Sequence, residues 1–160
     1  MTQHSAGILL YRYKDGTLQV LLVHPGGPFW VNKDLAAWSI PKGLLEEGED
    51  PLDTARREFA EETGFSVDGD FIDLGELKQP GGKVVHAWAL EGDLDETRIS
   101  SNTFPLEWPK HSGRIQEFPE VDRGEWFDAE TARLKIHKGQ IPFLDRLLSR
   151  LKPVHSPGSE

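Results

Sequence analysis

Two runs of apolar and β-favouring residues open the chain, one from Ala6 to Tyr13 and one that resumes at Leu18. The letters KDGT between them are typical of a tight turn, because Asp and Gly accept the backbone angles that such turns need. The pattern therefore predicts a β-hairpin. The next letters, GGPFWVNKDLAAW, are typical of a loop. WSIPKG predicts a short extended segment, since the residue before Pro41 is kept out of the helical region.

The pattern changes to a helical one at Pro51. Asp50 can cap the helix, Pro51 suits its first position, and Gly64 suits its end. About three turns fit between these signals. One side of this helix is expected to face the core, because apolar residues recur at helical spacing along it: Leu52, Ala55 and Phe59.

The remainder of the chain predicts strands followed by helices. FIDLGELKQ and KVVHAWAL are expected to form two strands joined through the turn PGG, and EVDRGEWF a later strand. AETARLKI and PFLDRLLSRL have helical patterns. The polar, proline-containing segment from Glu91 to Glu117 is interpreted as a long connection. We expect a single domain over residues 1–152 and a disordered tail over 153–160.

Composition narrows the possible partners. The net charge of −9 and a pI near 5.1 argue against a broad basic surface for DNA or for an anionic membrane. The chain contains no cysteine, so it can form neither a disulfide nor a catalytic thiolate. Its N-terminal apolar run is too short for a signal peptide or a membrane span, which favours a cytoplasmic location.

Three carboxylates lie on one side of the predicted helix. Glu58, Glu61 and Glu62 are spaced by three and four residues, so they are neighbours on its surface. Acidic residues at this spacing are commonly solvated, and like-charge pairs cost only about 0.2 to 0.5 kcal/mol each. The same arrangement suits Mg²⁺, which binds oxygen ligands together with substrate phosphates. The surrounding letters decide between these interpretations.

Those letters have a fixed spacing. From Gly43 the chain gives five residues, Glu49, seven residues, Arg57, Glu58, an apolar residue, one residue, Glu61, Glu62, one residue, Gly64 and an apolar residue. Seven fixed letters coincide by chance at on the order of 10⁻⁸ per starting point. The segment resembles the Nudix box at every specified position, and the resemblance extends over residues 5–150.

The resemblance to Nudix hydrolases implies an α+β fold, an α/β/α sandwich around a mixed sheet. It implies an enzyme that cleaves a nucleoside diphosphate linked to another moiety, with Mg²⁺ or Mn²⁺ and a water nucleophile. By position it implies the metal ligands Glu58, Glu62, Glu61 and the carbonyl of Lys42.

The resemblance also implies catalytic and structural roles. Arg57 would orient a catalytic glutamate, and Glu49 would help to fix the loop and the helix. Glu58, or a carboxylate outside the box, would be the base, with Glu120 as the outside candidate and Glu117 as its nearest rival. Gly43 and Gly64 would permit backbone geometry that a side chain obstructs.

The sequence determines the substrate less closely than it determines the family. The lead-in PKG resembles that of dinucleoside-polyphosphate and nucleoside-triphosphate hydrolases, but residues 81–83 read GGK where many diadenosine-polyphosphate enzymes have a tyrosine. Pro80 is near the place of a proline in ADP-ribose hydrolases, but a β-turn in QPGGK explains it without any ligand and is the favoured interpretation. ADP-ribose, a 5′-phosphorylated RNA end, a non-nucleoside diphosphate and an inactive nucleotide-binding module are the alternatives. An inactive module would lack box carboxylates, and this chain has all of them.

Contacts to a small-molecule nucleotide could come from several basic or aromatic residues. Phosphate contacts are expected from at most two of Lys78, Lys83, His86, Lys110, His111 and Arg114. Trp30, Phe104 and Trp108 could stack on a base, since aromatic faces accept any base. The amphipathic pattern of the last helix fits internal packing or a dimer surface, so both a monomer and a homodimer are expected forms.

Overall fold

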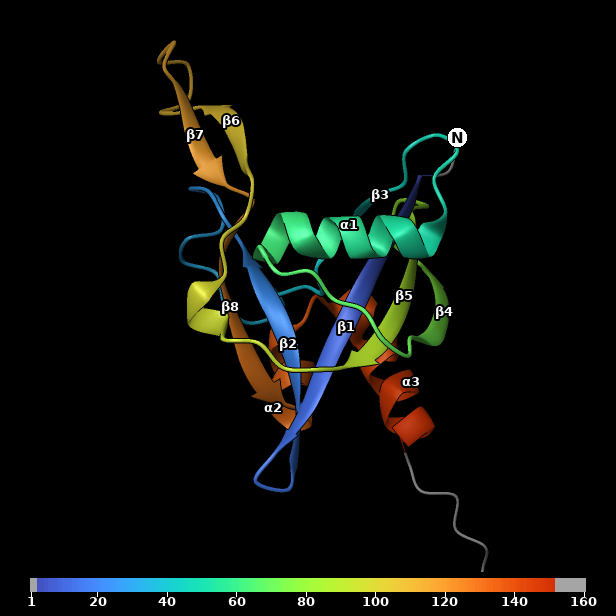
Figure 1. Ribbon diagram of the computed structural model, residues 1–160. Coiled ribbons are helices and arrows are strands. Elements are labelled where there is room, and N and C mark those ends of the chain that lie inside the picture. Colours follow the sequence, from blue (N-terminus) through green and yellow to red (C-terminus); the bar gives the residue numbers. More distant parts are fainter. Residues whose placement is uncertain (1–2, 152–160) are drawn as a thin grey trace, which may run out of the picture.

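A mixed β-sheet forms the centre of the molecule in the computed structural model, which describes residues 3–151 (Figure 1). Its order is β4-β5-β1-β2-β8, and β3 pairs with the start of β1. β1 and β5 are parallel, whereas the other neighbouring strands are antiparallel. The strand bounds are β1 His4–Lys14, β2 Thr17–Pro25, β3 Lys42–Leu44, β4 Ile72–Lys78, β5 Val84–Glu91 and β8 Val121–Asp128.

The central strand β1 is apolar on both faces, because both faces of the sheet are covered. Ile8 and Leu10 pack with the residues of one core cluster, and Leu9 and Tyr11 with those of another. Its pairing with β2 confirms the hairpin predicted from the first two apolar runs.

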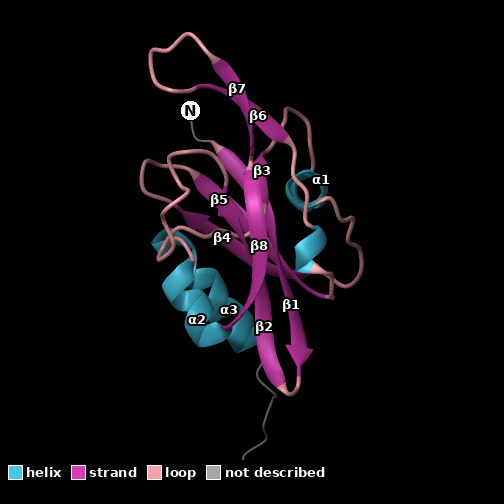
Figure 2. Cartoon of the chain, turned by 90° about the vertical axis from the view of Figure 1, so that its left-hand side faces the viewer, coloured by secondary structure: helices cyan, strands magenta, loops and turns pink. Residues whose placement is uncertain are grey.

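Three helices cover the two faces of the sheet (Figure 2). α1 (Pro51–Thr63) lies on one face, whereas α2 (Ala129–Lys135) and α3 (Ile141–Leu151) lie on the other. Phe59 of α1 and Phe143 of α3 are each fully buried against their own face. This arrangement confirms the predicted α+β sandwich with a mixed sheet. No helix within residues 3–151 is long and apolar enough to cross a membrane.

The segment from Glu91 to Glu117 was expected to be a long connection, and this prediction is wrong. It contains the short 3₁₀ helix η1 (Glu96–Arg98), the strand β6 (Thr103–Glu107) and most of β7 (Ile115–Pro119). β6 and β7 form a separate antiparallel hairpin that projects beyond the end of the main sheet (Figures 1 and 2). The predicted tail at 153–160 lies outside the described residues.

Candidate active site

The acidic helix α1 begins and ends at residues that satisfy its terminal backbone groups. The Asp50 carboxylate accepts hydrogen bonds from the backbone N–H groups of Leu52 and Asp53, at 3.1 and 3.3 Å. Gly64 closes the helix at φ 80°, and its N–H donates to the carbonyl of Ala60 at 2.8 Å. Phe59 is fully buried and so marks the side of the helix that faces the core. The carboxylates on the neighbouring side therefore lie at the border of the core.

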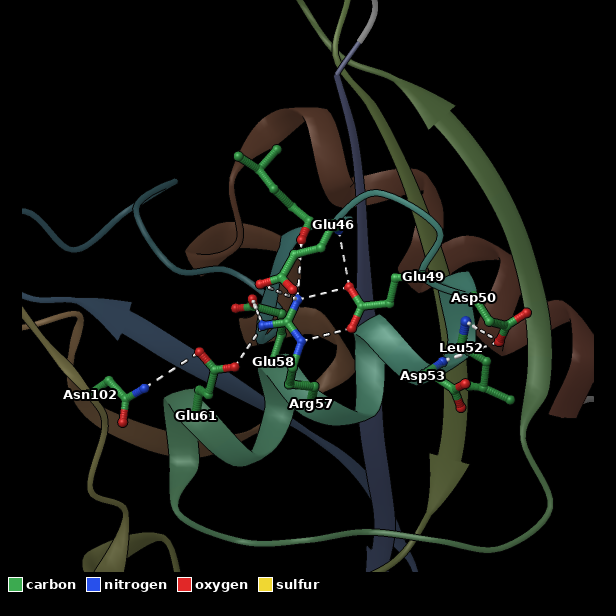
Figure 3. Close-up of polar contacts among 10 residues, drawn as sticks. Glu46, Glu49, Asp50, Leu52, Asp53, Arg57, Glu58, Glu61 and Asn102 are labelled. Atoms are coloured by element: carbon green, nitrogen blue, oxygen red, sulfur yellow. Dashed lines mark hydrogen bonds and ion pairs between the residues drawn. The ribbon is translucent and has the colours of Figure 1, made fainter.

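Arg57 is the centre of a group of carboxylates on α1 and the preceding loop (Figure 3). Its guanidinium donates through Nε and Nη2 to both oxygens of Glu49, at 2.8 and 3.0 Å. Nη1 donates to Glu58 at 2.8 Å and to Glu61 at 2.6 Å. The Arg57 side chain is only 30% exposed, so these bonds are partly shielded from water. Arg57 thereby joins the loop to the helix and fixes three of the box glutamates, one in the loop and two on the helix.

The same contacts shift the pKa values of Glu49 and Arg57. The Arg57 guanidinium holds the pKa of the Glu49 carboxyl well below its usual range, at about 2. Hydrogen bonds to Glu49 and Glu61 raise the pKa of Arg57, which therefore keeps its charge. Asn102 adds a further contact, since its amide Nδ2 lies 3.4 Å from Glu61 Oε1.

A cavity of about 180 Å³ lies beside this group. It is bordered by Glu62 of α1, Glu120 from the turn before β8, and Lys42 of β3, together with Val23, Pro25, Ser39 and Val121. The backbone N–H of Lys42 lies 3.4 Å from Glu62 Oε1. The structure therefore brings Glu120 from far along the chain to the carboxylates of the box. Glu117, its rival in the sequence, accepts a hydrogen bond from Thr103 within the β6–β7 hairpin.

Burial and mutual repulsion raise the pKa values of the carboxyl groups around this cavity. Burial, reinforced by the charge of Glu58, raises the pKa of Glu62 to about 8. Burial also raises the pKa of Glu58 and of Glu120, with Glu61 adding repulsion in both cases. The Lys42 ammonium has a lowered pKa because it too is buried. The site therefore holds several carboxyl groups whose charged forms are disfavoured by burial and by one another.

Gly43 makes this packing possible. A Cβ built at Gly43 would lie 2.1 Å from the carboxyl carbon of Glu58. Any side chain at this position would therefore displace Glu58. The requirement for glycine is steric, because the backbone of Gly43 does not adopt a positive φ.

The residues around the small cavity fit a divalent cation by donor type. Carboxylate oxygens are the ligands that Mg²⁺ and Mn²⁺ prefer, and a cation would offset the repulsion between them. Within residues 3–151 no three His, Asp or Glu side chains converge closely enough to hold one ion. Glu58 and Glu61 contact Arg57 instead. The assignment of Glu58, Glu61, Glu62 and the Lys42 carbonyl as metal ligands stays a prediction.

A larger cavity of about 520 Å³ adjoins the small one, and the two share Pro25, Ser39 and Lys42. Two of the residues predicted to bind substrate, Trp30 and Lys83, line the larger cavity. The others do not border either cavity: Lys78 is on β4, and Lys110 and Arg114 lie in or beside the turn of the β6–β7 hairpin. His86 pairs with Asp73 and stacks on Trp88.

Sequence reasoning did not find several residues at these cavities. Gln79, His137 and Gln140 line the larger cavity, and Asn102 contacts Glu61. Gln79, His137 and Asn102 lie in loops and Gln140 ends the 3₁₀ helix η2 (Lys138–Gln140), and none has a recognisable spacing relative to the box. The fold brings Gln79, His137 and Gln140 to the same cavity as Lys42 and Gly43.

Comparison with known proteins supplies independent evidence on the family. The model of the NUDIX domain matches residues 1–147. An RNA pyrophosphohydrolase of Bartonella henselae is 38% identical over 151 residues, covering 77% of this chain and 79% of that protein. An octanoyltransferase of Myxococcus xanthus is 34% identical over 95 residues, and the match spans 59% of this chain but only 24% of that protein.

Solved structures agree in fold. The NUDIX domain of Shewanella oneidensis NrtR, complexed with ADP ribose, superposes with a TM-score of 0.66 at 19% identity, over 95% of this chain and 90% of that one. A C. elegans Ap4A hydrolase in a binary complex gives a TM-score of 0.62 at 21% identity, over 94% of this chain and 98% of that one. These likenesses show that the chain has the same fold.

Proposed function

Because the chain belongs to the Nudix hydrolase family, we propose that it hydrolyses a diphosphate linkage in a nucleoside diphosphate joined to another group, with Mg²⁺ or Mn²⁺ as cofactor. The observation that carries the proposal is the small cavity between Lys42, Glu62 and Glu120, beside the glutamates that Arg57 holds. A diphosphate there would lie against Glu62 and Glu120.

In this proposal the cation, when bound, neutralises phosphate charge and activates the attacking water. Arg57 holds Glu58 and Glu61 in position with short, charge-assisted hydrogen bonds. A carboxylate near the water accepts its proton while the water oxygen bonds to phosphorus and the bridging P–O bond breaks. Glu58 and Glu120 are the candidates for this base, since burial raises the pKa of each above its usual value and so makes each a better proton acceptor.

For the substrate, the leading candidate is the 5′-terminal polyphosphate of an RNA. It is supported by the 38% identity to a protein named RNA pyrophosphohydrolase. The second candidate is a dinucleoside polyphosphate or nucleoside triphosphate, which the PKG lead-in to the box favours. Both place a nucleoside next to the phosphates that are cleaved.

A substrate panel tests the proposal. Purified protein with Mg²⁺ or Mn²⁺ is offered 5′-triphosphorylated RNA, diadenosine tetraphosphate, nucleoside triphosphates, ADP-ribose and a non-nucleoside diphosphate, and the products are identified. We expect turnover of the first or second substrate, with ¹⁸O from labelled water on one phosphate product. A protein inert on the whole panel would contradict hydrolysis and favour a binding module.

A further inference from the structure

We propose that the larger cavity is the subsite for a nucleoside monophosphate moiety, with Trp30 stacking on the base, Lys83 contacting the phosphate, and His137 and Gln79 hydrogen-bonding the nucleoside. The inference rests on the proposed function, because it names the part of the substrate that lies beside the cleaved linkage. It assigns recognition to residues outside the Nudix box.

The position of the cavity supports a role in substrate binding. The two cavities share Pro25, Ser39 and Lys42, so a ligand with phosphates among the box carboxylates extends directly into the larger space. Its volume of about 520 Å³ is within the range of roughly 300 to 1,000 Å³ typical of small-molecule sites. The remaining lining residues include Ala37, Leu44, Pro80 and Val85, which offer apolar surface to a base or a ribose.

The charge of the larger cavity differs from that of the rest of the molecule. The chain has 27 Asp and Glu residues, yet none of them lines this space, whereas Lys42 and Lys83 both do. Lys83 forms no ion pair with any residue of the range 3–151. Its backbone is fixed by a turn in which the Gln79 N–H donates to the Lys83 carbonyl at 2.6 Å. The cavity is therefore locally suited to an anionic group.

Trp30 supplies an aromatic surface at the cavity and remains 39% exposed. Its loop is held to the protein body at two points close by. The fully buried His24 contacts the carbonyl of Lys33 through Nε2 at 2.6 Å, and the Trp38 indole donates to Asp34 at 2.9 Å. The loop therefore presents Trp30 from a fixed backbone, as stacking on a planar base requires.

His137 and Gln79 offer directional polar groups. The N–H of Gly139 donates to His137 Nδ1 at 3.1 Å, so in the neutral ring the hydrogen is on Nε2 and can be donated to a ligand. Gln79 Nε2 donates to the Gly139 carbonyl at 2.9 Å, and no described residue hydrogen-bonds its amide oxygen. Gln140 differs, because its amide already bonds Ile40 and Ser39. Gln140 belongs to the supporting structure.

The test measures nucleotide binding and hydrolysis separately. AMP, GMP, CMP and UMP are titrated into the intact chain without divalent metal, followed by calorimetry, for wild type, Trp30→Ala, Lys83→Met and His137→Ala. We expect Trp30→Ala and Lys83→Met to weaken binding about tenfold each. His137→Ala is expected to change the preference among the four bases. On the best substrate of the panel, the KM of each variant should rise by a similar factor while kcat changes less than about twofold.

Matched controls come from the far end of the β1–β2 hairpin. Lys14→Met and Tyr13→Ala remove an exposed cation and an exposed aromatic ring, and both should bind and hydrolyse like wild type. Thermal unfolding of every variant distinguishes a lost contact from a lost fold. If the cavity variants match wild type in nucleotide affinity and in KM while the enzyme is active, the subsite is wrong and the proposed hydrolysis stands. If the enzyme is inert but the variants weaken nucleotide binding, the hydrolysis is wrong and the subsite stands.

Discussion

Single residues of the box act through contacts that the letters alone do not reveal. Spacing identified Arg57 and Gly43, but the structure shows that Arg57 hydrogen-bonds three glutamates and that Gly43 lies against the Glu58 carboxylate. The sequence could predict that glycine was needed, through backbone geometry. The actual reason is the close approach of a side chain from the helix, which depends on how β3 packs against α1.

Gly43→Ala tests this steric interpretation. The added Cβ would lie 2.1 Å from the Glu58 carboxyl carbon, so Glu58 must move. A displacement of about 1 Å at a catalytic group can cost roughly 10²-fold, and we expect kcat to fall by about that factor. Steady-state kinetics on the best substrate measure it.

Gly92→Ala is the matched control, because its added Cβ would meet one methyl group of Leu10, at 3.1 Å, and no carboxylate. Its kcat should remain near that of wild type. A Gly43→Ala enzyme with wild-type kcat would refute the steric role of Gly43.

At the scale of elements, the bond between Arg57 and Glu49 joins the loop before α1 to the helix itself. The capping signals predicted both ends of α1, and the structure confirms them. The β6–β7 hairpin was missed for a physical reason. Its strands lie outside the main sheet and are only five residues each. β6 alternates between exposed and half-buried residues, but β7 does not, so the alternation is too short to indicate a hairpin. Prolines at 105 and 119 also argued against strands.

The pH dependence of unfolding tests the tie between Glu49 and Arg57. The folded-state pKa of Glu49 is lowered from 4.5 to about 2, so the stability that it contributes is present above pH 4.5 and is lost as the pH falls toward 2. Glu49→Gln should therefore be less stable than wild type at pH 7. The difference in free energy of unfolding should shrink below pH 4.5 and disappear near pH 2, as measured by urea titration across this range.

Glu47→Gln serves as the control, since Glu47 is an exposed carboxylate of the same loop. Its free energy of unfolding should stay close to that of wild type at pH 7. A constant difference between Glu49→Gln and wild type from pH 7 to pH 2 would show that Glu49 does not act through its charge.

For the whole molecule, the sandwich places the helix that carries the box carboxylates and the two C-terminal helices on opposite faces of the sheet. α1 and its carboxylates lie on one face of the sheet, and α2 and α3 close the other (Figure 2). The layers could be predicted from element order and from the Nudix resemblance. The cavities could not, because loops from several distant parts of the chain form them.

Phe143→Ala tests this separation. Phe143 is fully buried beneath α3, so its truncation should cost about 3 to 5 kcal/mol of the free energy of unfolding. At temperatures well below the unfolding transition, kcat should change little, because α1 lies on the opposite face. Leu148→Ala, at a position that is 37% exposed on the same helix, should cost about 1 kcal/mol or less. A large fall in kcat for folded Phe143→Ala would show that the two layers are coupled.

The most direct test of the central claim is a Mg²⁺ titration of hydrolysis for wild type, Glu62→Gln and the control Glu47→Gln. Wild type and Glu47→Gln should share one Mg²⁺ dependence and lose turnover when the metal is chelated. Glu62→Gln should lose about 10² to 10³-fold in kcat while remaining folded. Turnover that survives chelation in wild type, or a Glu62→Gln enzyme with an unchanged Mg²⁺ response, would contradict metal-dependent hydrolysis at this site.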